Sequence, residues 1–164
     1  MSMISVKKLP ASRWKECRDL RLEALKEEPQ AFGSLFEDEK CLTEPIWKDR
    51  IGNALFALDG DRPIGMVVMI AGKTVKTSHI GNLYGLYVKT AYRKRAIGHL
   101  LVSEVIKAYQ GMERIRKIKL AVNGEQTAAI NLYERLGFSI AGRLKEEIFY
   151  DDKFYDEYIM EMAT

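Results

Sequence analysis

Three consecutive cations, Arg93, Lys94 and Arg95, stand shortly before a glycine, Gly98, and this spacing suits the binding of an anion. The residues before them form an apolar, aromatic run typical of a strand, and those after them recur at helical spacing. The first N–H groups of a helix have no partner inside the helix, and the helix dipole adds partial positive charge there. A glycine allows close approach to the backbone. We therefore expect a site for a pyrophosphate or a similar anion.

The same pattern also fits an ordinary corner between a strand and a helix whose cations are only solvated, because short glycine motifs arise often by chance. The charge distribution bears on this choice. Residues 89–119 contain nine Lys or Arg and two acids, although the whole chain has a net charge of only +3. Acids gather instead in residues 23–49 and 146–161. Two ligands of opposite charge would explain this division, and so, in part, would solvated helix faces.

The elements that must position these residues alternate between strands and helices, which indicates a mixed α/β sheet with helices on both faces. Ser12 is the expected N-cap of the first helix, and Gly85 is expected to mark a bulge or a close approach within the central strand. The predicted helices are residues 12–28, 43–52, 98–111 and 126–136, with residues 30–40 either a loop or a short helix. The predicted strands are residues 4–9, 54–58, 63–71, 77–88, 118–122, 138–147 and 154–160, with turns at 59–62 and 150–153.

Length and composition indicate one domain over residues 1–164, with 47% apolar and 30% charged residues. No apolar run approaches the roughly 20 residues needed to span a bilayer, and the first eight residues lack the apolar core of a signal peptide. We therefore expect a cytoplasmic protein that does not bind membranes. The two cysteines, Cys17 and Cys41, have no metal-ligand spacing, so we expect reduced thiols and no metal.

The first motif resembles a known cofactor signature. Arg93-x-x-Ala96-x-Gly98 is similar to the coenzyme A signature of the GNAT superfamily of N-acetyltransferases, Gln/Arg-x-x-Gly-x-Gly/Ala after a strand. Ala96 departs from the pattern at its first glycine. If that position requires a positive φ, the Cβ of Ala96 would cost on the order of 1 kcal/mol.

A second stretch resembles another element of the same superfamily. Residues 121–138 are similar to its Asn-x-x-Ala-Ile-x-x-Tyr-x-x-x-Gly-Phe pattern. Gln126 stands at the asparagine position and keeps the amide. Five residues match the pattern directly: Ala129, Ile130, Tyr133, Gly137 and Phe138. Taken alone, this stretch also fits an amphipathic helix with Tyr133 as a core aromatic residue. The order of the elements is similar to the GNAT fold from end to end, with a mixed sheet of about seven strands and one N-acetyltransferase domain.

The resemblance implies an acetyl-CoA-dependent N-acetyltransferase that moves the acetyl group directly to an amine. It implies that Val88 offers a backbone N–H to the oxyanion, and that the phenol of Tyr133 protonates the coenzyme A sulfur. His99 is expected near phosphate. The residues expected to bind the cofactor are Leu86, Tyr87, Val88, Arg93, Lys94, Arg95, Ala96, Ile97, Gly98, His99, Gln126 and Tyr133.

The general base is not evident from the sequence. Many members of the superfamily carry a glutamate on the central strand, but Asn82 and Tyr84 occupy the matching positions here. An ordered water, Glu37 or Glu39 are weak alternatives. His79, expected on the same strand, is more often a structural residue in such a place.

The acceptor is expected to be the primary amine of a small cationic molecule, because acids gather in the segments that flank the acceptor side of this fold. Phe32, Phe36, Trp47 and Tyr150 are candidates for the apolar walls of its site. A protein amine remains an alternative, as does a non-enzymatic sensor that binds acyl-CoA. No nucleic-acid partner is expected, because the aromatic motif of RNA-recognition domains is absent. A homodimer is compatible with the resemblance, since members of the superfamily are often dimeric.

Overall fold

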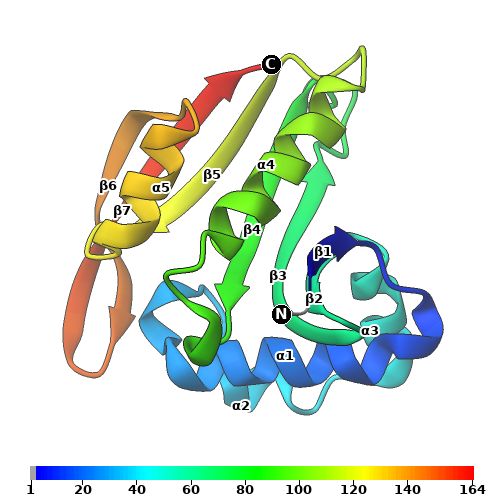
Figure 1. The fold of residues 1–164 in the computed structure, drawn as a ribbon. Coiled ribbons are helices and arrows are strands. Elements are labelled where there is room, and N and C mark those ends of the chain that lie inside the picture. The colour runs from blue at the N-terminus through cyan, green and yellow to red at the C-terminus, as the bar shows by residue number, and fades with distance from the viewer. Residues whose placement is uncertain (1–2) are drawn as a thin grey trace. The chain divides into compact units, whose positions relative to one another are not determined.

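The structure, a computed structural model, describes residues 3–164 and leaves Met1 and Ser2 outside the description. The chain divides into two compact units, each built from two segments. The first unit comprises Met1–Met69 and Gly85–Val105, and the second comprises Ile70–Tyr84 and Ile106–Thr164. Seven strands are hydrogen-bonded in the order β1-β2-β3-β4-β5-β7-β6 (Figure 1). The predicted mixed α/β sheet of about seven strands is thus confirmed. Within the described residues, no helix is long and apolar enough to cross a bilayer.

The strands of the first unit form an antiparallel meander. β1 (Ile4–Lys7) pairs with β2 (Ala54–Asp59), and β2 pairs with β3 (Arg62–Ala71), whose last two residues belong to the second unit. The hairpin predicted at residues 59–62 is present, with Asp59 opposite Arg62. Gly60 has a φ of 63° in the turn between them, a conformation that glycine adopts without steric cost.

Helices α1 (Trp14–Glu27), α2 (Phe36–Glu39) and α3 (Glu44–Ile51) complete the first unit on its N-terminal side. The predicted N-cap at Ser12 is wrong. Ser12 lies inside a 3-10 turn, η1 (Ala11–Arg13), and α1 begins directly after this turn with Arg13 at its N-cap position and no side-chain cap. The undecided segment 30–40 starts inside a second 3-10 turn, η2 (Pro29–Ala31), and contains the single turn of α2.

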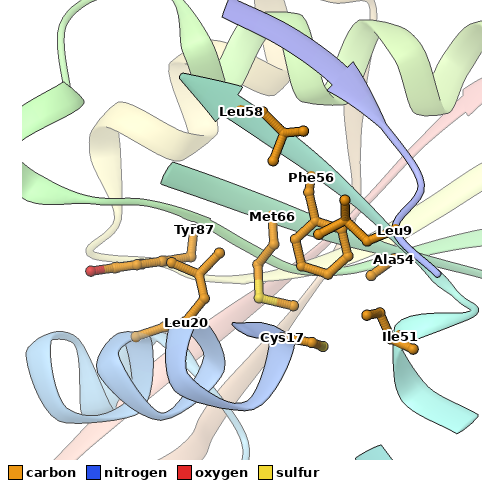
Figure 2. Close-up of a cluster of buried hydrophobic side chains, with 10 residues drawn as sticks. Leu9, Cys17, Leu20, Ile51, Ala54, Phe56, Leu58, Met66 and Tyr87 are labelled. Atoms are coloured by element: carbon orange, nitrogen blue, oxygen red, sulfur yellow. The ribbon is translucent and has the colours of Figure 1, made fainter. Parts of the chain in front are cut away.

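The core of the first unit lies between α1, α3 and the strands (Figure 2). It is a cluster of apolar side chains with the phenol of Tyr87 at its edge: Leu9, Cys17, Leu20, Ala24, Ile51, Ala54, Phe56, Leu58, Met66 and Tyr87. In Figure 2 the hydroxyl of Tyr87 points away from the other labelled side chains. Trp47 of α3 is also fully buried, so it is not a wall of an open acceptor site.

The second unit is built on β5 (Lys117–Asn123), α5 (Thr127–Arg135), β6 (Ser139–Tyr150) and β7 (Lys153–Ala163). β5 runs parallel to the start of β4 (Ile80–Val88) and antiparallel to β7, which forms a hairpin with β6. The predicted turn at 150–153 is confirmed by the pairing of Tyr150 with Lys153. Its central residues, Asp151 and Asp152, both have positive φ, as a type I′ turn requires.

One contact in the second unit brings a helix very close to a strand. α4 (Ile97–Gln110) begins in the first unit and ends in the second, where Tyr109 lies on β4. The Tyr109 hydroxyl donates to the carbonyl oxygen of Asn82 at 2.8 Å. A Cβ added to Gly81 would lie 2.7 Å from the Tyr109 ring, so only a glycine fits beneath it.

Candidate active site

The connection between β4 and α4 contains the predicted anion site. After β4 the chain forms a 3-10 turn, η3 (Thr90–Tyr92), and then an irregular turn over residues 93–96, and α4 starts at Ile97. We call residues 93–98, which are similar to the coenzyme A signature, the coenzyme A turn. Gly98 lies in the first turn of α4 and is half-buried. The predicted order of strand, cationic turn and helix is therefore present, and the end of β4, the turn and the start of α4 all belong to the first unit.

Two residues of the coenzyme A turn have left-handed backbone conformations, Lys94 with a φ of 61° and Ala96 with a φ of 58°. Ala96 is the residue that departs from the superfamily pattern. Because non-glycine residues adopt positive φ only at a steric cost, the pattern's glycine has a direct physical reason here. Alternation between left-handed and ordinary residues turns successive N–H groups to one side, which is a known way to cradle phosphate oxygens.

The cations of the coenzyme A turn fall into two groups. Lys94 and Arg95 are exposed, and among residues 3–164 no carboxylate lies within ion-pair distance of either. The Arg95 guanidinium lies 5.3 Å from the ring centre of Tyr92, whose hydroxyl donates to Asp59 at 2.9 Å. Arg93 instead contacts α1. His99 is exposed on α4 and shares a hydrogen bond with Ser103.

Gly85 marks a close approach within β4, as predicted. Its φ is 57°, and a Cβ there would lie 3.3 Å from Nη1 of Arg21 in α1. The strand residues that follow Gly85 carry the remaining expected contacts. Leu86 and Val88 are half-buried, whereas the side chain of Tyr87 is buried in the core. If Tyr87 contacts a cofactor, the contact is therefore made by its backbone and not by its side chain.

The other expected site residues belong to the second unit. Gln126 is the residue before α5, and its N–H donates to the carbonyl oxygen of Asn123 at 2.9 Å. Tyr133 on α5 is only 5% exposed, and its ring meets that of Phe138 edge-on at 5.7 Å. Burial raises the pKa of Tyr133 above its ordinary value. The phenol therefore holds its proton at neutral pH, as a general acid must.

The structure argues against the residues that the sequence offered as a general base. Glu39 is buried and forms ion pairs with Arg21 and Arg50, while Glu37 is exposed and pairs with Lys40. Burial alone would raise the pKa of Glu39, but the hydrogen bond and charge of Arg21 and the charge of Arg50 hold it below its ordinary value. A carboxylate stabilised in this way is a poor proton acceptor. His79 precedes β4 in an exposed turn and is not on the strand.

A carboxylate that the sequence analysis missed is Glu157 on β7. It is half-buried and is paired in register with Asn123, the last residue of β5. Burial, together with the charge of Glu147, raises the pKa of Glu157. Among the described residues it has no ion-pair partner, in contrast to Glu161 on the same strand, which binds Lys117 at 2.6 Å. The sequence indicated only that Glu157 lies on a strand. It did not show which residues that strand faces, so it could not show that Glu157 is half-buried without an ion-pair partner in residues 3–164.

Comparison with known proteins identifies the family. The model of the acetyltransferase (GNAT) family matches residues 14–138, so the chain belongs to this family of acetyl-CoA-dependent N-acetyltransferases. The L-amino acid N-acetyltransferase AaaT of Escherichia coli is 23% identical over 124 residues, which cover 72% of this chain and 75% of that protein.

Solved structures agree on the fold. The acetyltransferase of the GNAT family from Streptococcus pneumoniae superimposes with a TM-score of 0.87 at 24% identity, over 99% of this chain and 100% of that one. The yncA protein of Salmonella typhimurium, solved with its cofactor acetyl-CoA, gives a TM-score of 0.81 at 12% identity, over 99% and 94% of the two chains. Acetyl-CoA is the co-substrate of the family, and the coenzyme A turn offers the left-handed residues, helix start and unpaired cations that suit its phosphates. Among the described residues, no group of His, Cys, Asp or Glu side chains could hold a metal ion.

Proposed function

We propose that this protein acetylates the primary amine of a small cationic molecule, and that Glu157 faces that amine. The observation that carries the proposal is the half-buried Glu157 carboxylate without a cation of its own. An ammonium group would supply the missing charge. Because the pKa of Glu157 is raised, its carboxylate is also a stronger proton acceptor than an ordinary glutamate.

The acidic segments do not contribute equally to this proposal. In residues 23–49 several carboxylates are already neutralised within the first unit. Glu23 binds Lys89 at 2.8 Å, Glu44 binds Lys48 at 2.7 Å, and Glu39 is held by two arginines. In the hairpin of β6 and β7, Asp156 and Glu161 are also paired, with Arg143 and Lys117, but Glu147 adds negative charge near Glu157, which has no such partner in the described part of the chain. The attraction for a cation is therefore assigned to this hairpin.

The chemistry needs three proton movements when the acceptor arrives as an ammonium ion. The ammonium group first releases one proton to solvent. The neutral amine then forms the N–C bond as the thioester C–S bond breaks, and the nitrogen loses a second proton while the sulfur gains one. We assign the proton that leaves nitrogen during the transfer to Glu157 and the proton that reaches the sulfur to the phenol of Tyr133. The L-amino acid N-acetyltransferase of E. coli supports a small-molecule amine as the acceptor, although the acceptor's overall charge is inferred from this chain alone.

The proposal is tested by measuring thiol release from acetyl-CoA with polyamines, aminoglycosides, amino acids and short peptides that start with Lys or Ser, at low and high salt. Cationic small amines should react fastest, with rates that rise with pH and fall with salt. Turnover of only neutral or anionic amines would refute the charge argument, and turnover of peptides alone would refute the small-molecule preference.

A matched pair of variants tests Glu157 itself. Glu157→Gln should lower kcat/KM for the amine by roughly 10²-fold, the usual contribution of a general base, without weakening acetyl-CoA binding. Glu161→Gln is the control, because Glu161 lies on the same strand but is already paired with Lys117. Equal effects of the two changes would exclude a special role for Glu157.

A further inference from the structure

A single carboxylate oxygen at the end of α1 contacts three residues of the segment that leads from β4 into the coenzyme A turn. Oε2 of Glu27 accepts a hydrogen bond from the hydroxyl of Tyr87 at 2.5 Å and another from Oγ1 of Thr90 at 3.0 Å. The same oxygen lies 3.9 Å from Nη2 of Arg93. These three residues follow one another along the chain from the end of β4 to the start of the turn. Glu27 therefore contacts the segment between β4 and α4 at three successive points.

Arg93 is occupied by protein groups on several sides. Its Nε donates to the carbonyl oxygen of Val88 at 3.0 Å, and its Nη1 lies 3.1 Å from Oε1 of Glu28. The guanidinium carbon also lies 5.8 Å from the ring centre of Tyr87. Its charge is thus shared with Glu27 and Glu28 at the end of α1, whereas Lys94 and Arg95 have no such partners among the described residues.

Because Tyr87 is buried, its hydroxyl depends on Glu27 for a hydrogen bond. The Tyr87 side chain is only 2% exposed, so its hydroxyl needs a partner within the protein. The hydrogen bond from Tyr87 lowers the pKa of Glu27, burial opposes this shift, and Thr90 and the charges of Arg93 and Lys89 add to it. Glu27 is therefore ionised at neutral pH and remains a strong hydrogen-bond acceptor there.

We propose that Glu27 and Arg93 are positioning residues of the coenzyme A turn, and that Lys94, Arg95 and the first N–H groups of α4 meet the phosphates of the cofactor. Arg93 closes the turn against α1 and the end of β4 and does not bind phosphate directly. This inference rests on acetyl-CoA binding at the turn. It is independent of which amine is acetylated and of any role for Glu157.

The first test separates position from charge at Arg93. Coenzyme A binding is measured by calorimetry at several salt concentrations, without an amine. Arg93→Gln removes the charge but keeps an amide donor for the Val88 carbonyl, so affinity and its salt dependence should stay close to those of the wild type. Arg93→Ala removes both and should weaken binding about tenfold at every salt concentration. Lys94→Gln and Arg95→Gln should weaken binding mainly at low salt and flatten its salt dependence.

The second test concerns Glu27 and uses the ratio of kinetic constants. Glu27→Gln should raise the KM for acetyl-CoA about tenfold and leave kcat nearly unchanged, since the chemical step is not altered. Thr90→Val, which removes only one hydrogen bond at the exposed edge, should produce a smaller change in the same direction. Glu44→Gln serves as the control, because Glu44 is ion-paired with Lys48 within α3. Thermal unfolding of each variant confirms that it is folded.

Three outcomes would overturn the proposal. One is that Arg93→Gln flattens the salt dependence as strongly as Arg95→Gln, which would make Arg93 a phosphate ligand. Another is that folded Glu27→Gln and Thr90→Val bind coenzyme A as the wild type does. The third is that the wild type does not bind coenzyme A, which would remove the site itself. Failure of the amine proposal shows only in the turnover assays and leaves these binding data unchanged.

Discussion

Arg21 and Glu39 form a two-pronged ion pair that joins α1 to α2. Nε and Nη2 of Arg21 each lie 3.0 Å from a different carboxylate oxygen of Glu39, and Nη1 of Arg50 from α3 reaches one of these oxygens at 2.9 Å. Glu39 is only 4% exposed. The guanidinium of Arg21 also lies 4.9 Å from the ring centre of Phe32. One carboxylate therefore ties together the three helices of the N-terminal region.

Replacing Glu39 by Gln should lower the free energy of unfolding by about 3 kcal/mol, because it leaves Arg21 without its countercharge. The lower end of the usual range applies, since the Arg50 side chain is 41% exposed. Urea unfolding at pH 7 measures the change. Glu44→Gln, which breaks an exposed pair within α3, should cost at most about 0.5 kcal/mol. A similar small loss of unfolding free energy in both variants would mean that the buried ion pair stabilises the protein no more than the exposed one.

The same pair predicts how stability depends on pH. The pKa of Glu39 is lower in the folded protein than in the unfolded chain, so its stabilisation is present above the unfolded pKa and is lost as the pH falls through the folded pKa. Acidification from neutral pH should therefore destabilise the wild type more than Glu39→Gln. Parallel stability curves for the two proteins between pH 7 and pH 3 would contradict this prediction.

Ala96→Gly should stabilise the protein by about 0.5–1 kcal/mol, because Ala96 has a φ of 58° and glycine adopts this conformation without strain. The nearby Ala91→Gly is the control. Ala91 lies in η3 and does not have a positive φ, so glycine there should destabilise by about 0.5 kcal/mol through the entropy of the unfolded chain. Thermal unfolding compares the two. Destabilisation by both changes would show that the left-handed conformation is not retained in solution.

Tyr133→Phe should lower kcat by about 10²-fold and leave coenzyme A affinity nearly unchanged, since it removes a proton donor and keeps the ring. Tyr109→Phe is a matched control. Burial raises the pKa of Tyr109 to about 12, and its hydroxyl is committed to the Asn82 carbonyl. That control should lose about 1 kcal/mol of stability and little kcat. Full turnover by Tyr133→Phe would reduce Tyr133 to a packing residue.

The two thiols should differ sharply in reactivity. Cys17 is 2% exposed, and burial raises its pKa to about 11, whereas Cys41 is exposed. At pH 8 about one part in a thousand of Cys17 would be thiolate even if a reagent reached it. Titration with a chromogenic disulfide should therefore detect one fast thiol in the native protein and two after unfolding. A fast thiol that persists in Cys41→Ser would contradict this assignment.

Much of the fold was predictable from the sequence because its strongest signals are local. Alternating apolar residues, the Asp59–Arg62 turn and the Tyr150–Lys153 turn each specify a conformation within a few residues. The predicted start of α1 was wrong because it does not depend on local signals alone. Ser12 is a good cap by residue type, but the chain after Pro10 first forms a 3-10 turn, and this choice depends on packing beyond the local sequence.

The candidate site was predictable only in part. The left-handed conformation at Ala96 could be anticipated, because a family pattern with glycine at that position pointed to it. The partners of Arg93 and Glu39 lie far away in the sequence, on elements whose facing sides no periodicity reveals. The contacts of Arg93 with Glu27 and Glu28, and the ion pairs of Glu39 with two arginines, could therefore not be read from the sequence. Glu157 was missed because half-burial without a partner is a property of the folded strands.

The contact between Gly81 and Tyr109 makes these two positions interdependent in the history of the protein. A ring of this size at position 109 is tolerated only while position 81 has no side chain, and an alanine at 81 would demand a smaller neighbour on α4. Position 81 can gain a side chain only if position 109 loses its ring. In a set of related sequences, a bulkier residue at 81 should therefore accompany a smaller one at 109, and sequences that keep the tyrosine should keep the glycine.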